Sequence, residues 1–196
     1  MNSEERRQQW DLKYEQGLPS LTKPDPYFVS AYERFVGSHF PTAGVALDLA
    51  SGLGRHALWL AGRGWQVSVV DVSDVAIAKL RQAARELNVN IDLLVGDAAD
   101  YKFERERFDL IVLFYHLDRS LFPKIVLALK PGGLLICKMS LRWDHSGKST
   151  ADSGNLLYRN QMPSLLPELQ VLHYQERPVR DRGVAEFVGR KSGKSA

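Results

Sequence analysis

The residues best suited to chemistry lie in the segment 46–57, ALDLASGLGRHA, where an apolar run leads into a turn that contains glycines. Gly52 and Gly54 allow the backbone to approach a ligand closely, and a helix beginning after them offers unpaired N–H groups. The segment from Gly52 to Ala57 fits the G-x-G-x-x-A pattern of dinucleotide-binding turns. Asp71, about 20 residues further on, is placed to accept hydrogen bonds from both hydroxyls of an adenosine ribose. This spacing predicts a nucleoside-binding site.

Two further aspartates refine that prediction. Asp48 lies inside the first apolar run, where a carboxylate is costly unless a polar group meets it. It would suit a ligand with an ammonium or sulfonium group, and it would repel a pyrophosphate. Asp97 follows a later apolar run, in Gly96-Asp97-Ala98, where its side chain could accept from an exocyclic adenine amine. A turn aspartate without a ligand is the alternative for Asp97.

Apolar runs typical of strands alternate with helical patterns around these residues. We predict strands at 45–50, 65–71, 91–97, 108–116, 133–140, 169–176 and 184–191. We predict helices at 3–16 with Ser3 as N-cap, 26–36, 56–64, 74–87 with Ser73 as N-cap, and 121–130. The alternation indicates βαβ units, and the short link between the last two strands makes them antiparallel. The predicted fold class is α/β, a Rossmann-like seven-stranded, mostly parallel sheet with an antiparallel last strand and helices on both faces. Ligands of such sheets bind at the carboxyl ends of the strands.

The composition is that of an ordinary soluble protein of 196 residues, with 44% hydrophobic and 25% charged residues. No uncharged apolar stretch reaches the roughly 18 residues of a membrane-spanning helix, so we expect no membrane association. The one cysteine, Cys137, lies in an apolar strand and cannot form an internal disulfide, which favours a cytoplasmic location. Residues 124–196 hold 12 Lys and Arg against 6 Asp and Glu, which suits an anionic substrate, a nucleic acid or simply a solvated basic surface.

Several motifs together resemble those of class I S-adenosylmethionine-dependent methyltransferases. The segment 48–54, DLASGLG, resembles the first motif of the family, although Ser51 stands where a further glycine or a cysteine is commoner. Asp71 matches the ribose-binding acid and Gly96-Asp97 the adenine-side motif. The runs FDLIVLFYHLDRSLF (108–122) and LKPGG (129–133) resemble the fourth-strand motif and the turn before strand five. The match covers about residues 44–140. The opening WDLKY and the C-terminal hairpin resemble small bacterial tellurite-resistance-type methyltransferases.

The resemblance implies S-adenosylmethionine as the cofactor and one domain over 1–196. Within it we expect an N-terminal helical cap or lid at 1–40, a cofactor-binding core at 41–143, and a polar loop with a C-terminal β-hairpin at 144–196. The implied cofactor-binding residues are Asp48, Ala50, Ser51, Gly52, Gly54, Arg55, Asp71, Val72, Asp97, Ala98 and Phe114. The sequence has no H-E-x-x-H, paired-cysteine or calcium-loop motif, so we predict no metal site.

Residues that follow the fourth and fifth strands are the candidates for the methyl acceptor. His116 could act as a general base or orient an anion, or it could be a structural or surface histidine without a role. Tyr115 could pack beside the methyl group, or it could be an aromatic residue of the core. Further along, an anionic substrate could meet Arg142. The other candidate substrate-binding residues are aromatic, with Trp143 beside Arg142 and a lid formed by Trp10, Tyr14 and Tyr27.

We therefore predict a cytoplasmic enzyme that methylates a small molecule, as a monomer or homodimer and with no nucleic-acid partner. The alternatives are an RNA or protein methyltransferase, an NAD(P)-dependent oxidoreductase, and a cofactor-binding protein that has lost its acceptor chemistry. Asp48, Asp97 and the closing hairpin argue against the oxidoreductase. No RNA-binding signature is present, and Phe114-Tyr115-His116-Leu117 stands where an Asn-Pro-Pro-Tyr motif would indicate another acceptor class.

Overall fold

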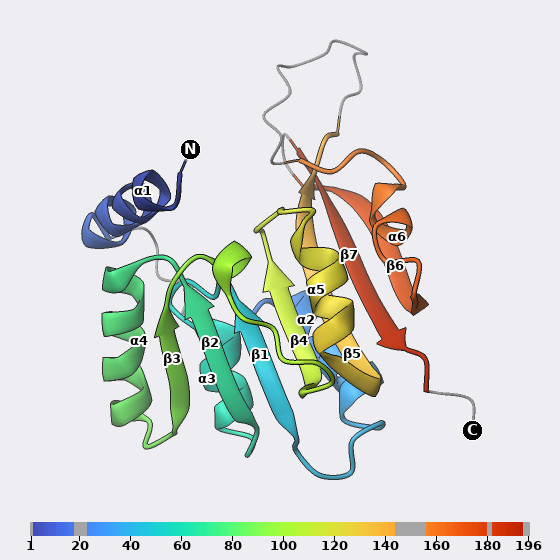
Figure 1. Cartoon of the computed structure of the whole chain (residues 1–196), viewed down its shortest axis with the longest axis horizontal. Helices are drawn as coiled ribbons and strands as arrows, with labels where there is room; N and C mark the ends of the chain where they lie inside the picture. Colours follow the sequence, from blue (N-terminus) through green and yellow to red (C-terminus); the bar gives the residue numbers. More distant parts are fainter. Residues whose placement is uncertain (1, 18–22, 144–155, 180–181, 194–196) are drawn as a thin grey trace.

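A twisted sheet with helices on both faces makes up the computed structural model, which describes residues 2–17, 23–143, 156–179 and 182–193 (Figure 1). The described strands run in the order β3-β2-β1-β4-β5-β7-β6. Strands β1 to β5 pair in parallel, and β7 is antiparallel to both of its neighbours, β5 and β6. This arrangement confirms the predicted fold class. The strands are β1 (Val45–Leu49), β2 (Gln66–Asp71), β3 (Ile91–Val95), β4 (Phe108–Phe114), β5 (Leu129–Leu141), β6 (Leu169–Val179) and β7 (Arg182–Lys191).

Helices α1, α2 and α4 begin at residues whose side chains satisfy free backbone N–H groups. Asn2, rather than the predicted Ser3, caps α1, because its side chain accepts from the Glu5 N–H while Glu5 accepts from the Asn2 N–H. Ser73 caps α4 as predicted, accepting from the Ala76 N–H at 3.0 Å. The helices are α1 (Ser3–Glu15), α2 (Pro26–Ala31), α3 (Arg55–Ala61), α4 (Asp74–Glu86), α5 (Leu121–Ala128) and the unpredicted α6 (Gln161–Ser164).

Several predicted boundaries are wrong for local backbone reasons. The fourth strand ends at Phe114 and not at residue 116, because Tyr115 has a φ of +58° and leaves the extended conformation. The third strand ends at Val95, and Asp97 caps a 3₁₀ turn, Ala98–Asp100. The helix predicted at 26–36 changes to a π-helix over Tyr32–Val36. The fifth strand begins at Leu129, which shortens the helix before it.

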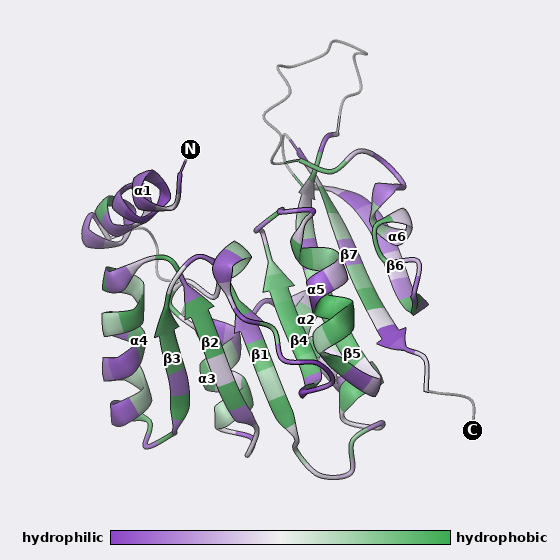
Figure 2. Ribbon diagram, in the orientation of Figure 1, coloured by the Kyte–Doolittle hydropathy of each residue, from purple (hydrophilic) through white to green (hydrophobic). Residues whose placement is uncertain are grey.

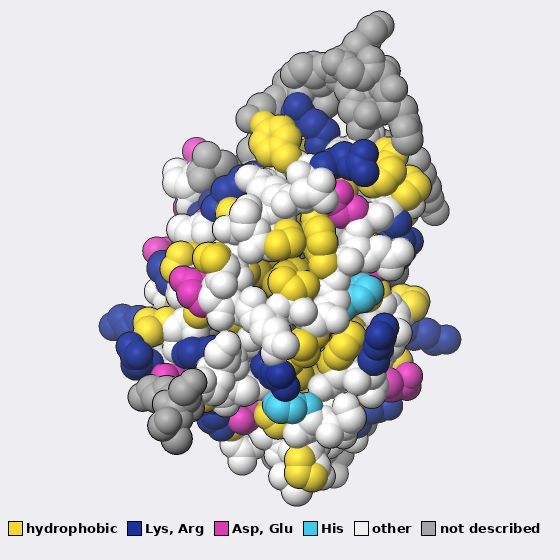
Figure 3. All heavy atoms as spheres, turned by 90° about the vertical axis from the view of Figure 1, so that its right-hand side faces the viewer, with side chains coloured by type: hydrophobic (Ala, Val, Ile, Leu, Met, Phe, Trp, Pro, Cys, Tyr) yellow, Lys and Arg dark blue, Asp and Glu magenta, His cyan; other side chains and the backbone are white. Residues whose placement is uncertain are grey.

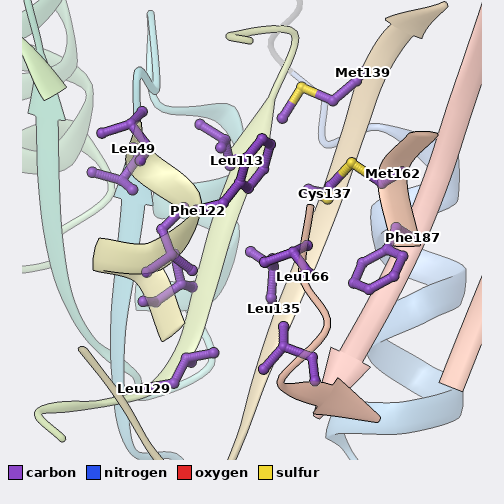
Figure 4. Packing of buried hydrophobic residues seen from close by; sticks show 14 of the residues in the cluster. Leu49, Leu113, Phe122, Leu129, Leu135, Cys137, Met139, Met162, Leu166 and Phe187 are labelled. Carbon is purple, nitrogen blue, oxygen red and sulfur yellow. The ribbon is translucent and has the colours of Figure 1, made fainter. Parts of the chain in front are cut away.

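Alternate residues of the central strands supply two hydrophobic cores. Phe28 of α2, Leu60 of α3 and Leu80 of α4 are fully buried against one face. On the other face, α5 and α6 pack on β4, β5 and β7 through Phe122, Met162 and their neighbours (Figure 4). Cys137 is buried in this second core, as its apolar strand predicts. Strands β1 and β4 are hydrophobic over most of their length (Figure 2), which is typical of strands buried on both faces.

The carboxyl ends of β1 to β4 meet at one edge of the sheet, and α1 lies beside that edge (Figure 1). Strand β6 forms the outer strand of the sheet on the side opposite β3. The molecular face on that side carries hydrophobic side chains near its centre, with Lys and Arg side chains around them (Figure 3). No described helix is long and apolar enough to cross a membrane. The predicted polar loop at 144–155, much of the extended segment 18–26 and the end of the C-terminal tail lie outside the described residues.

Candidate functional site

A cavity of about 660 Å³ opens at the carboxyl edge of the sheet. Its walls come from α1, the turn after β1, the ends of β2, β3 and β4, and the start of β7. The lining residues are Arg6, Trp10, Lys13, Tyr14, Asp48, Ala50, Ser51, Gly52, Leu53, Arg55, His56, Asp71, Val72, Asp97, Ala98, Phe114, Tyr115, His116 and Arg182. The structure thus brings together most of the candidates, whereas Gly54, Tyr27, Arg142 and Trp143 are not part of the lining.

The turn after β1 has an unusual backbone that only some residues tolerate. Ala50, Gly52 and Gly54 have φ values of +50°, +57° and +70°. A Cβ on Gly52 would lie 2.6 Å from the Tyr14 hydroxyl oxygen, and one on Gly54 would lie 2.5 Å from a methyl group of Leu80. Gly54 is therefore required for packing of the turn against α4, and Gly52 for the close approach of α1. Ala50 adopts this conformation at a cost of about 1–2 kcal/mol.

Asp71 ties the turn after β1 to the start of α4. One carboxylate oxygen accepts from the Gly52 N–H at 2.7 Å, and the other accepts from the Ser73 N–H at 2.9 Å. Burial raises the pKa of Asp71, and the two backbone hydrogen bonds partly oppose this. Each oxygen of a carboxylate can accept a second hydrogen bond. Asp71 thus remains able to bind a pair of ligand hydroxyls while it holds the turn in shape.

Asp48 is buried at the base of the cavity with little to satisfy it. Its carboxylate accepts one hydrogen bond, from the Ala57 N–H at 3.1 Å in the first turn of α3. Burial raises the pKa of Asp48 to about 7. A cationic group that entered the cavity would favour the ionised form of this carboxyl.

Asp97 is bound by α1 in this structure. It accepts from the Ser3 hydroxyl at 2.7 Å and from the Ala99 N–H at 3.0 Å, and it pairs with Arg6. Although burial opposes ionisation, these partners together hold the pKa of Asp97 below its ordinary value. An adenine amine would therefore meet a carboxylate that α1 already orients, and Arg6 stands beside it on the cavity wall.

Three more hydrogen bonds hold α1 against α4. Asp11 accepts from the Ser73 hydroxyl and, at 3.2 Å, from the Val75 N–H. The Lys79 ammonium donates to the carbonyl oxygen of Tyr14 at 2.6 Å. These contacts place the stacked rings of Trp10 and Tyr14 on the cavity lining, whereas Tyr27, the third residue of the predicted lid, is not part of it.

Sequence reasoning missed a buried chain of ion pairs behind the end of β4, which we call the Lys138 network. The Lys138 ammonium lies 3.1 Å from Asp25 and 3.2 Å from Glu186. Arg55 lies 3.7 Å from Asp25, and Arg177 lies 2.7 Å from Glu186. The signal was present, because Lys138 and Glu186 are each the one charge within an otherwise uncharged run, 131–141 and 183–189, and they are direct cross-strand partners. Burial disfavours the Lys138 ammonium, but its acidic neighbours outweigh this and raise its pKa.

His56 lies in the cavity wall, and sequence reasoning missed it as well. Its ring packs against Phe114 at 4.3 Å and Phe28 at 4.6 Å between ring centroids. Burial lowers the pKa of His56 well below its usual range, so the ring is neutral at pH 7. Its Nε2 accepts from the Asp25 N–H at 3.3 Å, which links the wall to the Lys138 network.

Tyr115 and His116 stand at the far end of the cavity. Tyr115 has a strained backbone, its N–H donates to the Lys138 carbonyl at 2.7 Å, and its ring centroid lies 5.8 Å from the Arg182 guanidinium. Strained non-glycine residues of this kind cluster at functional sites. The Nε2 atom of His116 is buried without a hydrogen-bond partner among the described residues. Burial lowers the pKa of His116, so the imidazole, which belongs to the cavity lining, is neutral.

The remaining acceptor candidates lie elsewhere. Tyr27 sits behind Phe114, with 6.2 Å between ring centroids, and its hydroxyl has no hydrogen-bond partner within the described ranges. Arg142 stacks over the ring of Tyr158 at 5.5 Å, and Trp143 lies against Gly183 at the start of β7. The structure thus does not bring Arg142 and Trp143 to the cavity. Across the parts of the chain that the structure describes, no group of three or more His, Cys, Asp or Glu could hold a metal ion.

Comparisons with known proteins agree with this geometry. Residues 46–133 match a family described as a methyltransferase domain. The chain is 29% identical over 167 residues to a demethylmenaquinone methyltransferase of Lactococcus lactis subsp. lactis (strain IL1403). That alignment covers 75% of this chain and 64% of the relative, so the chain spans less than two thirds of the relative's length.

Solved structures share the fold over nearly the whole chain. The [4+2]-cyclase SpnF superposes with a TM-score of 0.80 at 18% identity, covering 98% of this chain and 97% of its own. A 1,6-didemethyltoxoflavin-N1-methyltransferase of Burkholderia thailandensis was solved with S-adenosylhomocysteine. It superposes with a TM-score of 0.73 at 16% identity, covering 98% of this chain and 91% of its own. TehB from Haemophilus influenzae superposes with a TM-score of 0.72 at 20% identity, covering 92% of this chain and 66% of its own. These likenesses establish the fold, and the cyclase among them shows that the fold alone does not fix the reaction.

Proposed function

We propose that this chain is a class I methyltransferase that transfers a methyl group from S-adenosylmethionine to a small-molecule acceptor, and the match of residues 46–133 to a methyltransferase-domain family supports this. One observation carries the proposal. A single cavity joins the nucleoside-binding features, Asp71, the glycine turn and Asp97, to a second region at the end of β4 that contains Tyr115 and His116. A site with both regions can hold a cofactor and an acceptor side by side.

The residues present fit S-adenosylmethionine. Asp71 keeps acceptor capacity for the two ribose hydroxyls, and Asp97 lies where the adenine amine would reach. Asp48, buried with one hydrogen bond, suits the cationic methionyl amino group, and Arg55 at the start of α3 suits the methionyl carboxylate. Gly52 lets Tyr14 of α1 approach the turn beside Asp71, because a side chain there would meet the Tyr14 hydroxyl.

The protein contributes to the reaction by positioning the two substrates and by excluding water from the site. S-adenosylmethionine supplies a methyl carbon that its sulfonium already makes electrophilic. Holding the acceptor in line with that carbon is worth about 7–11 kcal/mol of the barrier. Helix α1, tied down at Asp97 and Ser73, covers the site and excludes water. For an acceptor that arrives protonated, the neutral imidazole of His116 takes the proton.

Calorimetry with the full chain tests the cofactor half of the proposal. We expect S-adenosylmethionine and S-adenosylhomocysteine to bind with micromolar affinity, and NAD⁺ and NADP⁺ to bind at least a hundredfold more weakly. The variant Asp71→Ala should lose most of the affinity, whereas Asp92→Ala, which alters an exposed acid of β3 outside the cavity lining, should not. Preferential binding of a nicotinamide cofactor would contradict the assignment.

A turnover screen tests the acceptor half. S-adenosylhomocysteine release is measured with thiols, amines, phenols, oxyanions, an RNA pool and a peptide pool as separate arms. We expect release with at least one small-molecule class and none above background with RNA or peptides. Release with the polymers alone would redirect the assignment to an RNA or protein methyltransferase. Tight cofactor binding with no release in any arm would instead favour a protein that uses this fold without methyl transfer.

A further inference from the structure

The carboxylates of the cavity gather at one end. Among the described residues, every carboxylate of the lining, Asp48, Asp71 and Asp97, comes from β1 or from the ends of β2 and β3, where the cofactor residues lie. The described residues at the end of β4 and the start of β7 contribute no carboxylate to the lining. We call this second region, formed by Phe114, Tyr115, His116 and Arg182, the acceptor subsite.

Arg182 is the one permanently charged side chain of the acceptor subsite. It is the first residue of β7, and because β7 runs antiparallel to β5, its start lies at the carboxyl edge of the sheet. Its guanidinium stacks 5.8 Å from the ring centroid of Tyr115. No described Asp or Glu lies within ion-pair distance of it, which distinguishes it from Arg177 and Arg55. Arg182 is thus a cation stacked on Tyr115, and among the described residues no hydrogen-bond acceptor occupies its donors.

The Lys138 network behind the acceptor subsite does not neutralise Arg182. Three bases, Arg55, Lys138 and Arg177, share the two carboxylates of Asp25 and Glu186, and the one excess positive charge is the charge that Arg55 offers to the cofactor. Both carboxylates are buried and already paired, and the Lys138 ammonium lies 6.0 Å from the Tyr115 ring centroid, so the network presents no free carboxylate to the acceptor subsite.

The cofactor uses only part of this charge. Arg55 adjoins the glycine turn on the cofactor side and fits the one carboxylate that S-adenosylmethionine carries. Arg182 comes from β7, beyond β4 and β5 in the sheet order, and has no partner among the cofactor-binding residues. His116, whose pKa is lowered by burial, is neutral and adds no competing cation. The charge of Arg182 therefore remains for the second substrate.

We propose that the methyl acceptor carries an oxyanionic group, a carboxylate or a phosphate, which pairs with Arg182 beside the Tyr115 ring. This inference rests on the proposed methyl transfer and names the class of acceptor. A lone pair of the acceptor forms the bond to the methyl carbon, the carbon–sulfur bond breaks, and the electron pair of that bond stays on sulfur, which becomes a neutral thioether. A nucleophile that carries a proton passes it to His116. The anionic group holds the acceptor in place and matches the positive sulfonium that faces it.

Binding to the full chain saturated with S-adenosylhomocysteine tests this inference. The probes are benzoate, phenyl phosphate and the neutral benzamide, each titrated by calorimetry. We expect at least one anion to bind tenfold or more tightly than benzamide, and the comparison of the two anions distinguishes a carboxylate subsite from a phosphate subsite. The variant Arg182→Gln should weaken anion binding at least fivefold and leave benzamide unchanged. The matched control is Arg190→Gln, on the same strand but bound to Gln170, and it should behave as the wild type.

The outcomes separate this inference from the proposed function. Failure of S-adenosylhomocysteine to bind would contradict the methyltransferase assignment itself. If it binds, but neither anion binds more tightly than benzamide, the acceptor is not held as an anion and the inference is wrong. Equal anion binding by wild type and Arg182→Gln would likewise overturn the role of Arg182. A thermal melt of each variant verifies that it is folded before titration.

Discussion

Replacement of Asp48 by Asn should stabilise the folded chain while it damages the site. The Asp48 side chain is buried in β1, and its carboxylate accepts one backbone hydrogen bond, from Ala57 at 3.1 Å. An asparagine has nearly the same shape, and its carbonyl oxygen can accept the same hydrogen bond. The substitution therefore removes the buried charge and leaves the packing intact.

The expected magnitude follows from the pKa of Asp48. Burial raises that pKa to about 7, compared with about 4 in an unfolded chain. Between these values the folded chain holds a proton that the unfolded chain has released, so stability falls as the pH rises from about 4 to about 7 and then levels off. Each pH unit is worth about 1.4 kcal/mol. The free energy of unfolding lost through the raised pKa of Asp48 is therefore about 4 kcal/mol at pH 8, where Asp48 is ionised, and about 1–2 kcal/mol at pH 5, where the folded chain keeps it protonated.

Urea denaturation of the cofactor-free chain at pH 5 and pH 8 measures this effect. We expect Asp48→Asn to be more stable than the wild type at both values, with an advantage about 3 kcal/mol larger at pH 8. The control Asp74→Asn, at an exposed acid in the first turn of α4, should show no such pH dependence. Equal stability of Asp48→Asn and wild type at pH 8 would refute the reasoning, because the carboxylate would then be stabilised by something that the structure does not contain.

Cofactor binding gives a second readout of the same group. If Asp48 must be ionised to meet the methionyl amino group, the affinity for S-adenosylmethionine should fall about tenfold for each pH unit below 7. The Asn variant should bind weakly with no such dependence. Calorimetry at pH 6 and pH 8 distinguishes these two behaviours.

Three further substitutions test other parts of the site. Asp71→Ala should weaken S-adenosylmethionine binding at least tenfold, since it removes ribose hydrogen bonds of about 1.5–3 kcal/mol each, and unchanged calorimetric affinity in a folded variant would sink the assignment. Gly52→Val should abolish cofactor binding, because its Cβ would lie 2.6 Å from the Tyr14 hydroxyl oxygen at a φ of +57°, and wild-type binding would show that this turn is not the cofactor cradle. His116→Ala should lower turnover about 10²–10⁴-fold for a protonated acceptor with cofactor affinity unchanged. The acid limb of the wild-type pH–rate profile should lie below pH 6.5, because burial lowers the His116 pKa, and an unaltered rate in the variant would place the acceptor elsewhere.

The parts of the site that the sequence predicted are those set by short stretches of chain. The turn that follows β1, the acid at the end of β2 and the aspartate after β3 each follow directly from a strand end, so a local pattern places them. The alternation of strands and helices likewise predicts the sheet and the edge at which these residues meet.

The missed features depend on pairings between distant segments. Lys138 and Glu186 meet because β7 lies between β5 and β6, an order that a hairpin motif does not specify. Arg6 and Asp97, 91 residues apart, meet only when α1 lies over the end of β3. Arg142 follows β5 and was expected at the cavity, but the chain there turns toward Tyr158 instead.

The way in which α1 is held also affects the turnover rate that we expect. No residue of α1 is buried, and the helix is held over the cavity by hydrogen bonds and ion pairs of Ser3, Arg6, Arg7, Asp11 and Lys79. Such a cover can detach without opening the hydrophobic core, so it allows the spent cofactor to leave. Salt weakens exposed ion pairs. If release of the product limits turnover, the turnover rate should therefore increase with salt concentration, up to the salt concentration at which the cofactor no longer binds.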